Sequence, residues 1–477
     1  MARVPEPAVP DRATSLPSRL HDLAARAPDA PALSDGDVVL SRYDLDARTT
    51  RLARAFAARG VGRGDLVSIA LPNVVAHVEC SVAAWKLGAV PMPLSAKLPP
   101  AERDAVLEVA APALVVTPDD IPEPDPDDSP LPDVVGPSWK APTSGGSTGR
   151  PKVIVAGQAA CTEQVLARAD GLGIDRTEGS VFLATAPLHH NAPYMFSLMA
   201  LLQGHHVVLM QRFDAARALE LVGELGATWL YLVPTMMGRM LRLPDEAWEA
   251  ADLTTLRTAL HVGAPCPPEV KRGWLERLPD PDVLLEIYSG TESQAGTAIR
   301  GREWLEHPGS VGRVTRGHMK VAGDEGRELA TGTVGEVWMR PDGPPTYHYL
   351  GAEPRLRDGW ESLGDMGSFD AAGYLHLADR RADMLLVGGA NVYPAEIEAA
   401  LLTHPDVVDA VVVGRPDDDL GQVVHAVVRA APAPDDLPDR LRAHLAERLA
   451  PHKVPRGVDV VDHALHDDAG KIRRSAL

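Results

Sequence analysis

The sequence predicts an α/β protein in which a large N-terminal domain, with mostly parallel sheets covered by helices, precedes a small α+β C-terminal domain. Short apolar runs typical of buried strands alternate with helical patterns through most of the chain. Strands that alternate with helices form parallel sheets with helices on both faces. The pattern changes after about residue 380. We therefore expect the two domains to span residues 1–380 and 381–477.

The individual elements of the large domain follow from local patterns. A helix is expected after Ser41, because Asp44 stands three residues later in the spacing of a capping box, and Gly60 is expected to end it. An acidic, proline-rich stretch at 118–138 predicts a surface loop. The remaining predicted elements are a helix at 78–87 and strands at 66–71, 89–94, 207–210, 227–233, 258–263 and 283–288.

The small domain has its own strand and helix signals. Residues 407–414 and 423–430 are rich in valine and predict two strands. Four leucines then recur every fourth residue from Leu437 to Leu449, and Pro451 follows them. This spacing predicts a helix with one apolar face that ends before the proline.

The composition excludes several classes of partner. A net charge of −19 argues against nucleic acid and anionic membranes, since both select basic surfaces. The three cysteines follow no metal-binding or redox spacing, which indicates a reducing compartment. The proline-rich N-terminus lacks the apolar run of a secretory signal, and no apolar stretch is long enough to span a bilayer. We expect a cytoplasmic protein without a membrane or nucleic-acid partner.

A glycine- and hydroxyl-rich segment is the first candidate functional element. It comprises Ser144, Gly145, Gly146, Ser147, Thr148 and Gly149, and Lys152 follows it. Glycines allow a backbone to point successive N–H groups at an anion, while the hydroxyls and the lysine add donors and charge. The lysine does not directly follow the last glycine, so the segment is no Walker A loop. Phosphate binding is favoured over a flexible linker because apolar residues follow Lys152 at once.

Five motifs in order make the chain resemble the adenylate-forming superfamily of acyl- and aryl-CoA synthetases, peptide-synthetase adenylation domains and firefly-type luciferases. The first motif is the glycine-rich segment with Lys152. The other four are Tyr288-Ser-Gly-Thr291-Glu292, Gly359-Trp360 with Gly364-Asp365, Ala378-Asp379-Arg380 with the Gly388-Gly389 segment, and Gly470-Lys471. Together they cover nearly the whole chain, which makes the resemblance far more specific than any one motif.

The resemblance implies a role for each matched residue. Lys471 would be the catalytic cation at the carboxylate and the α-phosphate, a role that the scarcity of lysine (eight, against 39 arginines) makes noteworthy. Glu292 would hold Mg²⁺, a hard cation that prefers carboxylate oxygen, and Thr291 would contact the α-phosphate. The nucleotide residues would be the loop at 144–149 with Lys152 on the phosphates, Asp365 and Arg380 on the ribose, and Gly263, Ala264, Pro265 and Tyr288 around the adenine.

The resemblance also implies an acid pocket and a second half-reaction. His189, His190 and Asn191 would line the acid pocket, and a pocket wall is favoured over a metal site because no third ligand has a recognisable spacing. Gly290 stands where many relatives carry a larger residue, which favours an aromatic or bulky acid. The small domain would be mobile about a hinge at Ala382, where relatives carry Asp or Lys. Gly388 and Gly389 would line the tunnel for the incoming thiol.

The implied activity is the ATP- and Mg²⁺-dependent conversion of an acid to an acyl-AMP, followed by transfer to coenzyme A. Ala382 leaves other acceptors open: a carrier-protein thiol, an amine, or the activation of a non-carboxylic acid such as nitrite in a diazo-forming relative. A non-catalytic nucleotide-binding module is a different class of function. The presence of every motif, Lys471 included, argues against that class.

Overall fold

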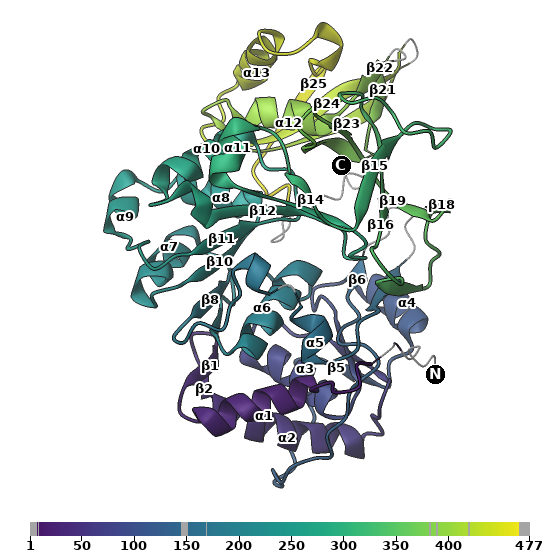
Figure 1. The fold of residues 1–477 in the computed structure, drawn as a ribbon. Coiled ribbons are helices and arrows are strands. Elements are labelled where there is room, and N and C mark those ends of the chain that lie inside the picture. The colour runs from purple at the N-terminus through teal and green to yellow at the C-terminus, as the bar shows by residue number, and fades with distance from the viewer. Residues whose placement is uncertain are drawn as a thin grey trace.

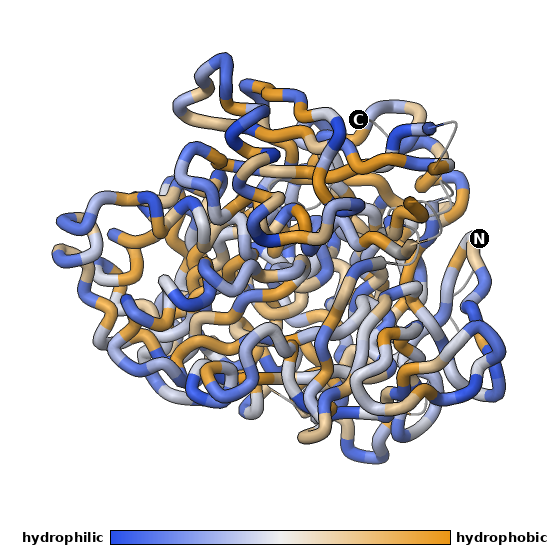
Figure 2. The backbone as a smooth tube through the Cα atoms, turned by 90° about the horizontal axis from the view of Figure 1, so that it is seen from above, coloured by the Kyte–Doolittle hydropathy of each residue, from blue (hydrophilic) through white to orange (hydrophobic). Residues whose placement is uncertain are grey.

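The fold is taken from a computed structural model, which describes residues 7, 9–144, 151–167, 169–380, 383–387, 390–417 and 420–466. Figure 1 shows the N-terminal helices at one end of the molecule and the C-terminal elements at the other. No helix in the described part of the chain is long and apolar enough to cross a membrane. In Figure 2 hydrophilic segments occupy many of the outer turns of the backbone.

A nine-stranded sheet forms the centre of the large domain. Its strand order is β14-β13-β12-β11-β10-β8-β9-β1-β2. The pairs from β1 through β9, β8, β10 and β11 to β12 are parallel, and antiparallel pairs stand only at the two ends. The strands are β1 Pro31–Ser34, β2 Val39–Ser41, β8 Val181–Ala184, β9 His206–Leu209, β10 Trp229–Leu232, β11 Thr258–His261, β12 Leu284–Tyr288, β13 Gly296–Arg300 and β14 Arg313–Arg316. The predicted mostly parallel sheet and four of its predicted strands are confirmed.

Helices pack around this sheet and connect strands within the large domain. They are α1 Leu16–Arg26, α2 Arg42–Ala58, α3 Val75–Lys86, α5 Thr162–Val165, α6 Asn191–Gln203, α7 Ala215–Glu224, α8 Pro234–Leu241, α9 Asp245–Ala250, α10 Pro268–Arg277 and α11 Gly301–Glu306, with short 3₁₀ turns η1 Asp170–Leu172 and η2 Pro281–Val283. Helix α2 begins with the predicted capping box of Ser41 and Asp44, and Gly60 follows it with φ +88°.

Three smaller sheets complete the first 380 residues. The parallel sheet β4-β3-β5 contains β3 Leu66–Ile69, β4 Val90–Pro93 and β5 Leu114–Val116, and α4 Pro100–Ala110 precedes β5. The sheet β17-β7-β6 joins β6 Thr143–Ser144 and β7 Lys152–Ala156 to β17 Tyr347–Leu350. The antiparallel sheet β15-β16-β19-β18, with β20 beside β19, contains β15 His318–Ala322, β16 Gly335–Arg340, β18 Leu356–Arg357, β19 Trp360–Phe369 and β20 Leu375–Arg380.

The predicted surface loop at 118–138 is largely irregular and exposed, but its end is not. Residues 136–138 are buried. They are buried because Gly136 lies against the main chain of Gly88 and its carbonyl accepts a hydrogen bond from Ala160 N. The prediction was therefore wrong for the last three residues of the stretch.

The C-terminal residues have a hydrophobic core of their own, built from residues between Leu385 and Val458. A sheet of order β22-β21-β24-β23, with β25 parallel to β24, packs against two helices. The elements are β21 Leu385–Val387, β22 Ala390–Val392, α12 Pro394–Leu402, β23 Val407–Asp417, β24 Gly421–Ala430, α13 Leu437–Ala446, η3 Pro451–Lys453 and β25 Gly457–Val461. Both predicted strands are confirmed, whereas the helix ends before Leu449. The boundary at 380/381 stays a prediction.

Candidate active site

Two sequence motifs meet at the end of the central sheet. Tyr288 ends β12, and its hydroxyl donates to Asp365 Oδ2 at 2.7 Å. Asp365 lies in β19, where it pairs in register with Arg380 of β20. Three of the six residues predicted to contact the adenine or the ribose therefore lie together, although 77 residues separate Tyr288 from Asp365.

The predicted adenine loop lies on the neighbouring strand. Gly263, Ala264 and Pro265 follow the carboxyl end of β11, which runs parallel to β12 with His261 paired to Glu286. Gly263 has φ +95°, a conformation that favours glycine. In parallel α/β sheets, ligands bind at the carboxyl ends of the strands. The loop after β11 and Tyr288 at the end of β12 occupy this kind of position.

Glu292 stands in a network of charged and hydroxyl groups. Its carboxylate is 5% exposed, and its Oε1 accepts from Lys152 Nζ at 3.1 Å and from the Tyr349 hydroxyl at 2.5 Å. Lys152 Nζ also donates to the Tyr349 hydroxyl at 3.0 Å. Burial and the Glu292 charge raise the pKa of Tyr349, so it remains a hydroxyl donor. The structure thus brings together Lys152 of the first motif and Glu292 of the second.

A second carboxylate, that of Glu361, is connected to this network through Tyr347. Tyr347 donates its hydroxyl to Glu361, and the rings of Tyr347 and Tyr349 lie 4.6 Å apart. Burial raises the pKa of Glu361. Sequence reasoning missed both tyrosines and Glu361. The only available signal was the alternation Tyr347-His348-Tyr349, which places the two tyrosines on the same face of β17.

The side chains around Glu292 suit a magnesium ion and the phosphates of ATP. Glu292 offers a buried carboxylate oxygen, the ligand type that Mg²⁺ prefers. Lys152 supplies a cation beside it for a phosphate oxygen, and Thr291 immediately precedes Glu292 in the turn after β12. The residues present therefore fit a magnesium–phosphate group.

The predicted acid-pocket segment surrounds the start of α6. The His189 and His190 rings lie 4.2 Å apart, and Asn191 is the first residue of the helix. Asn191 Oδ1 accepts from Lys140 Nζ at 2.5 Å. No group of three or more histidine, cysteine or acidic side chains in the described residues could hold a metal ion. Lys140 was not predicted, because an isolated lysine before the glycine-rich segment carries no motif.

Neighbouring side chains lie close to Gly290. A Cβ atom at this position would lie 2.2 Å from Leu363 Cδ1 and 3.0 Å from Glu292 Oε2. Leu363 of β19 fills the space that the missing side chain leaves, a packing that the sequence around Gly290 does not reveal. The preference for an aromatic or bulky acid that was based on Gly290 stays a prediction.

Several predicted site residues lie outside the described residues. These are Gly145, Gly146, Ser147, Thr148, Gly149, Ala382, Gly388, Gly389 and Lys471, together with the side chains of Ser144 and Arg380. Their roles in phosphate binding, hinge motion, acceptor binding and catalysis stay predictions.

Comparisons with known proteins address the family. A model of the AMP-binding enzyme family matches residues 20–138 and 142–344, and a model of the AMP-binding enzyme C-terminal domain matches residues 396–471. The chain belongs to the AMP-binding enzyme family. The predicted adenylate-forming superfamily is confirmed, and the protein is an adenylate-forming ligase.

Individual relatives resemble this family member along its whole length. A feruloyl-CoA synthase of Amycolatopsis sp. is 33% identical, over 95% of this chain and 96% of its own. The structure of o-succinylbenzoate-CoA synthetase from Bacillus subtilis with its acyl-adenylate intermediate has a TM-score of 0.81 and 27% identity, and covers 97% of this chain and 98% of its own. The same enzyme is also known with ATP and a magnesium ion. The amide bond synthetase McbA of Marinactinospora thermotolerans has a TM-score of 0.80, 26% identity and coverage of 97% and 99%.

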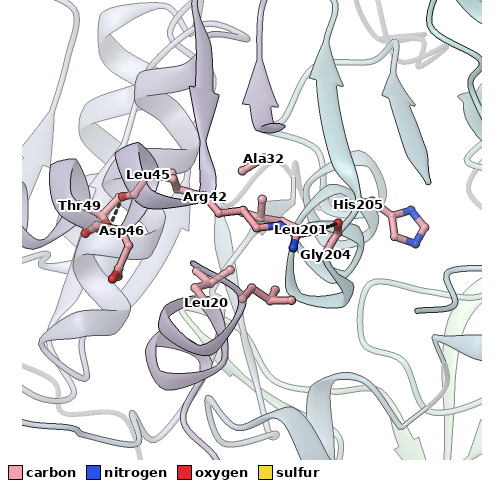
Figure 3. A pocket seen from close by; sticks show the side chains of 10 residues that line it. Leu20, Ala32, Arg42, Leu45, Asp46, Thr49, Leu201, Gly204 and His205 are labelled. Atoms are coloured by element: carbon pink, nitrogen blue, oxygen red, sulfur yellow. Dashed lines mark hydrogen bonds between the residues drawn. The ribbon is translucent and has the colours of Figure 1, made fainter. Parts of the chain in front are cut away.

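A separate hollow lies between α1, α2 and the end of α6 (Figure 3). Its walls are mainly apolar and include Leu20, Leu45 and Leu201. Arg42 donates to the Gly204 carbonyl at 2.7 Å, so its charge is already engaged. None of the predicted nucleotide or acid residues lines this hollow.

Proposed function

We propose that this ligase activates a carboxylic acid with ATP to an acyl-adenylate and then transfers the acyl group to coenzyme A. The observation that carries the proposal is the meeting of Lys152 and Glu292 beside the Tyr288–Asp365 pair. This arrangement offers a cation and a carboxylate for the phosphate end of ATP and a hydrogen-bonded aspartate for its ribose. The likeness to a synthetase known with its acyl-adenylate supports the same chemistry.

The first half-reaction follows from the charges in the site. One oxygen of the substrate carboxylate attacks the α-phosphorus, the bond to the bridging oxygen breaks, and pyrophosphate leaves. Bound Mg²⁺ would neutralise phosphate charge. Glu292 would hold it, and Lys152 would then turn from Glu292 toward a phosphate oxygen. Tyr349 would keep the Glu292 carboxylate oriented while Lys152 turns away, because its own hydrogen bond to Glu292 does not depend on Lys152. Holding two anions in contact and neutralising their charge is the main catalytic task.

The second half-reaction distinguishes the possible acceptors. In the leading proposal the thiolate of coenzyme A attacks the acyl carbon, a thioester forms, and AMP leaves. The naming of a 33% identical relative as a feruloyl-CoA synthase supports this acceptor. The similarity to an amide bond synthetase supports an amine as the second candidate, in which the attacking nitrogen loses a proton. A carrier-protein thiol and the activation of nitrite remain further alternatives.

Product analysis tests the proposal directly. The enzyme is incubated with ATP, Mg²⁺ and a panel of acids, and pyrophosphate release is measured without any acceptor. The products of active acids are then identified by mass spectrometry after addition of coenzyme A, simple amines or buffer alone. We expect acyl-CoA only with coenzyme A. Amide products without thioester would favour the second candidate, and the absence of acid-dependent pyrophosphate release would contradict adenylation itself.

A further inference from the structure

Lys140 is a buried lysine beside the predicted acid pocket. It is 5% exposed, and its backbone carbonyl accepts from Ala156 N and Ser138 Oγ, both at 3.0 Å. Its ammonium donates to Asn191 Oδ1 at 2.5 Å and lies 5.1 Å from the centre of the Trp139 ring. Among the described residues, no carboxylate comes within 4.0 Å of Lys140 Nζ.

The other buried lysines in the part of the chain that the structure describes each pair with a carboxylate. Lys86 pairs with Asp46 at 2.6 Å, and Lys271 pairs with Glu286. An unpaired buried charge costs on the order of several kcal/mol of stability. The amide oxygen of Asn191 offers a dipole but no counter-charge. Lys140 therefore differs from Lys86 and Lys271 in having a neutral hydrogen-bond partner.

The surroundings of Lys140 favour an anion from the substrate. Burial lowers the pKa of Lys140 to about 7, Glu292 acts in the opposite direction, and Arg316 lowers it further. Asn191 opens helix α6, whose first turn has no side-chain cap, and the N–H groups of such a turn favour negative charge. A negative group placed here would meet the ammonium, the Asn191 amide and the helix end together.

We propose that Lys140 and Asn191 bind a second acidic group of the substrate, so that the acid is a dicarboxylic acid or a phenolic carboxylic acid. The reacting carboxylate belongs at the other end, where Lys152, Glu292 and Tyr349 mark the phosphate site. Among the described residues, Lys140 forms no hydrogen bond with that network, but Glu292 raises the pKa of Lys140 through space. One short molecule would span the two ends. This inference rests on the proposed adenylation.

The assignment explains why Asn191 is the partner of the lysine. Its Oδ1 holds the ammonium, while its NH₂ group remains a donor for a substrate oxygen. The ammonium has three donors and uses one of them on Asn191. Two donors of one site can therefore converge on a single carboxylate or phenolate.

Matched acids test the proposal through pyrophosphate release. Each pair differs by one acidic group remote from the reacting carboxylate: benzoate with isophthalate, benzoate with 4-hydroxybenzoate, and butyrate with succinate. At least one second-acid member should have a kcat/KM about 10- to 100-fold above its partner, the range expected for a charge-assisted hydrogen bond. Lys140→Gln should remove most of that preference, and Lys86→Gln, at a buried but paired lysine, should leave it unchanged.

Calorimetry separates this inference from the proposed function. Binding of the same acid pairs is measured in the presence of a non-hydrolysable ATP analogue, in wild type and Lys140→Gln. A preference in binding that Lys140→Gln removes would support the acid site even if no pyrophosphate were released. If Lys140→Gln fails to fold, Lys140→Met replaces it, because this variant removes the buried charge. Three results would overturn the proposal. They are equal kcat/KM and equal affinity for both members of every pair, retention of the preference in the Lys140 variants, and activation of nitrite alone.

Discussion

At the residue scale, the site is organised around one buried carboxylate. Glu292 receives Lys152 and Tyr349 on a single oxygen, and its backbone carbonyl accepts from Thr346 Oγ1 at 2.6 Å. These donors hold Glu292 in place, and both side-chain hydrogen bonds go to Oε1 rather than to its second oxygen. Such orientation of the carboxylate suits the magnesium role that we propose for Glu292.

Replacement of Glu292 by glutamine tests the metal role. Glu292→Gln keeps the shape and removes the charge, so the Mg²⁺ concentration for half-maximal pyrophosphate release should rise by about tenfold or more, as for loss of an orienting or ligating group. A magnesium titration of the steady-state rate measures it. Glu303→Gln, which removes a surface carboxylate bound to Tyr374, serves as the control. An unchanged metal requirement in Glu292→Gln would remove Glu292 from this role.

Lys140 makes a prediction about stability and pH. Burial lowers its pKa from 10.5 to about 7 in the folded protein. The destabilisation is therefore full below pH 7 and shrinks as the pH rises toward 10.5, where the unfolded chain also loses the proton. Lys140→Met should raise the free energy of unfolding, and more at pH 6 than at pH 9.

Urea unfolding of Lys140→Met at these two pH values provides the measurement. Lys453→Met, at an exposed lysine paired with Glu396, is the control and should show little change at either pH. If Lys140→Met were less stable than wild type at pH 6, the lysine would stabilise the fold, and this would contradict its assignment to substrate binding.

At the scale of elements, strand pairing brings distant motifs together. Strand β17 pairs with β7 in antiparallel register, Tyr349 opposite Ile154, and this places Tyr349 beside Lys152 although 197 residues separate them. In the same way β19 brings Asp365 to Tyr288 at the end of β12. The nucleotide site depends on how the smaller sheets dock on the large one.

Asp365 provides the test at this scale. Asp365→Ala removes the carboxylate that we propose accepts the ribose hydroxyls, and it leaves the buried apolar core intact. ATP affinity should fall by about 10- to 100-fold, the cost of lost hydrogen bonds to a charged group. Isothermal calorimetry measures the affinity, and thermal unfolding shows whether the variant remains folded. Asp370→Ala, in the turn between β19 and β20, is the matched control. Equal ATP affinity in a folded Asp365→Ala protein would refute the ribose role.

Sequence patterns predicted much of the fold and only part of the site. Alternating strands and helices require a parallel sheet, and the Ser41–Asp44 spacing marked the start of α2. Motif residues such as Glu292 and Asp365 could be located by resemblance. Tyr349 and Lys140 could not, because ordinary residue types gain a role only when β17 and α6 bring partners to them. The proximity of Leu363 to Gly290 could not be predicted either, since Leu363 comes from another strand.

At the scale of the whole molecule, the two proposed half-reactions would require two arrangements of one site. The C-terminal elements have a separate core, and Arg242 of the large domain donates to the Val408 carbonyl at 2.6 Å. The hinge predicted at Ala382 carries no polar group. A charged residue at this position can form different hydrogen bonds in two orientations of the small domain. The equilibrium between these orientations shifts only by the difference in their interaction free energies.

Ala382→Asp tests the hinge and the acceptor together. If coenzyme A is the acceptor, the substitution should change the rate of thioester formation more than the rate of adenylation. Single-turnover measurements of both half-reactions give the two rates, and Ala372→Asp in an exposed turn is the control. Equal effects on both half-reactions would argue against a hinge at this position.

The central claim is that the protein forms an acyl-adenylate. Its most direct measurement is acid-dependent pyrophosphate release from ATP and Mg²⁺, with the acyl-AMP identified by mass spectrometry, in wild type and in Lys471→Ala. We expect release with at least one acid of the matched panel, and a rate about 10²- to 10³-fold lower in Lys471→Ala because a preorganised charge at the reacting phosphate is lost. Pyrophosphate release that no acid stimulates, with no acyl-AMP formed, would contradict the account.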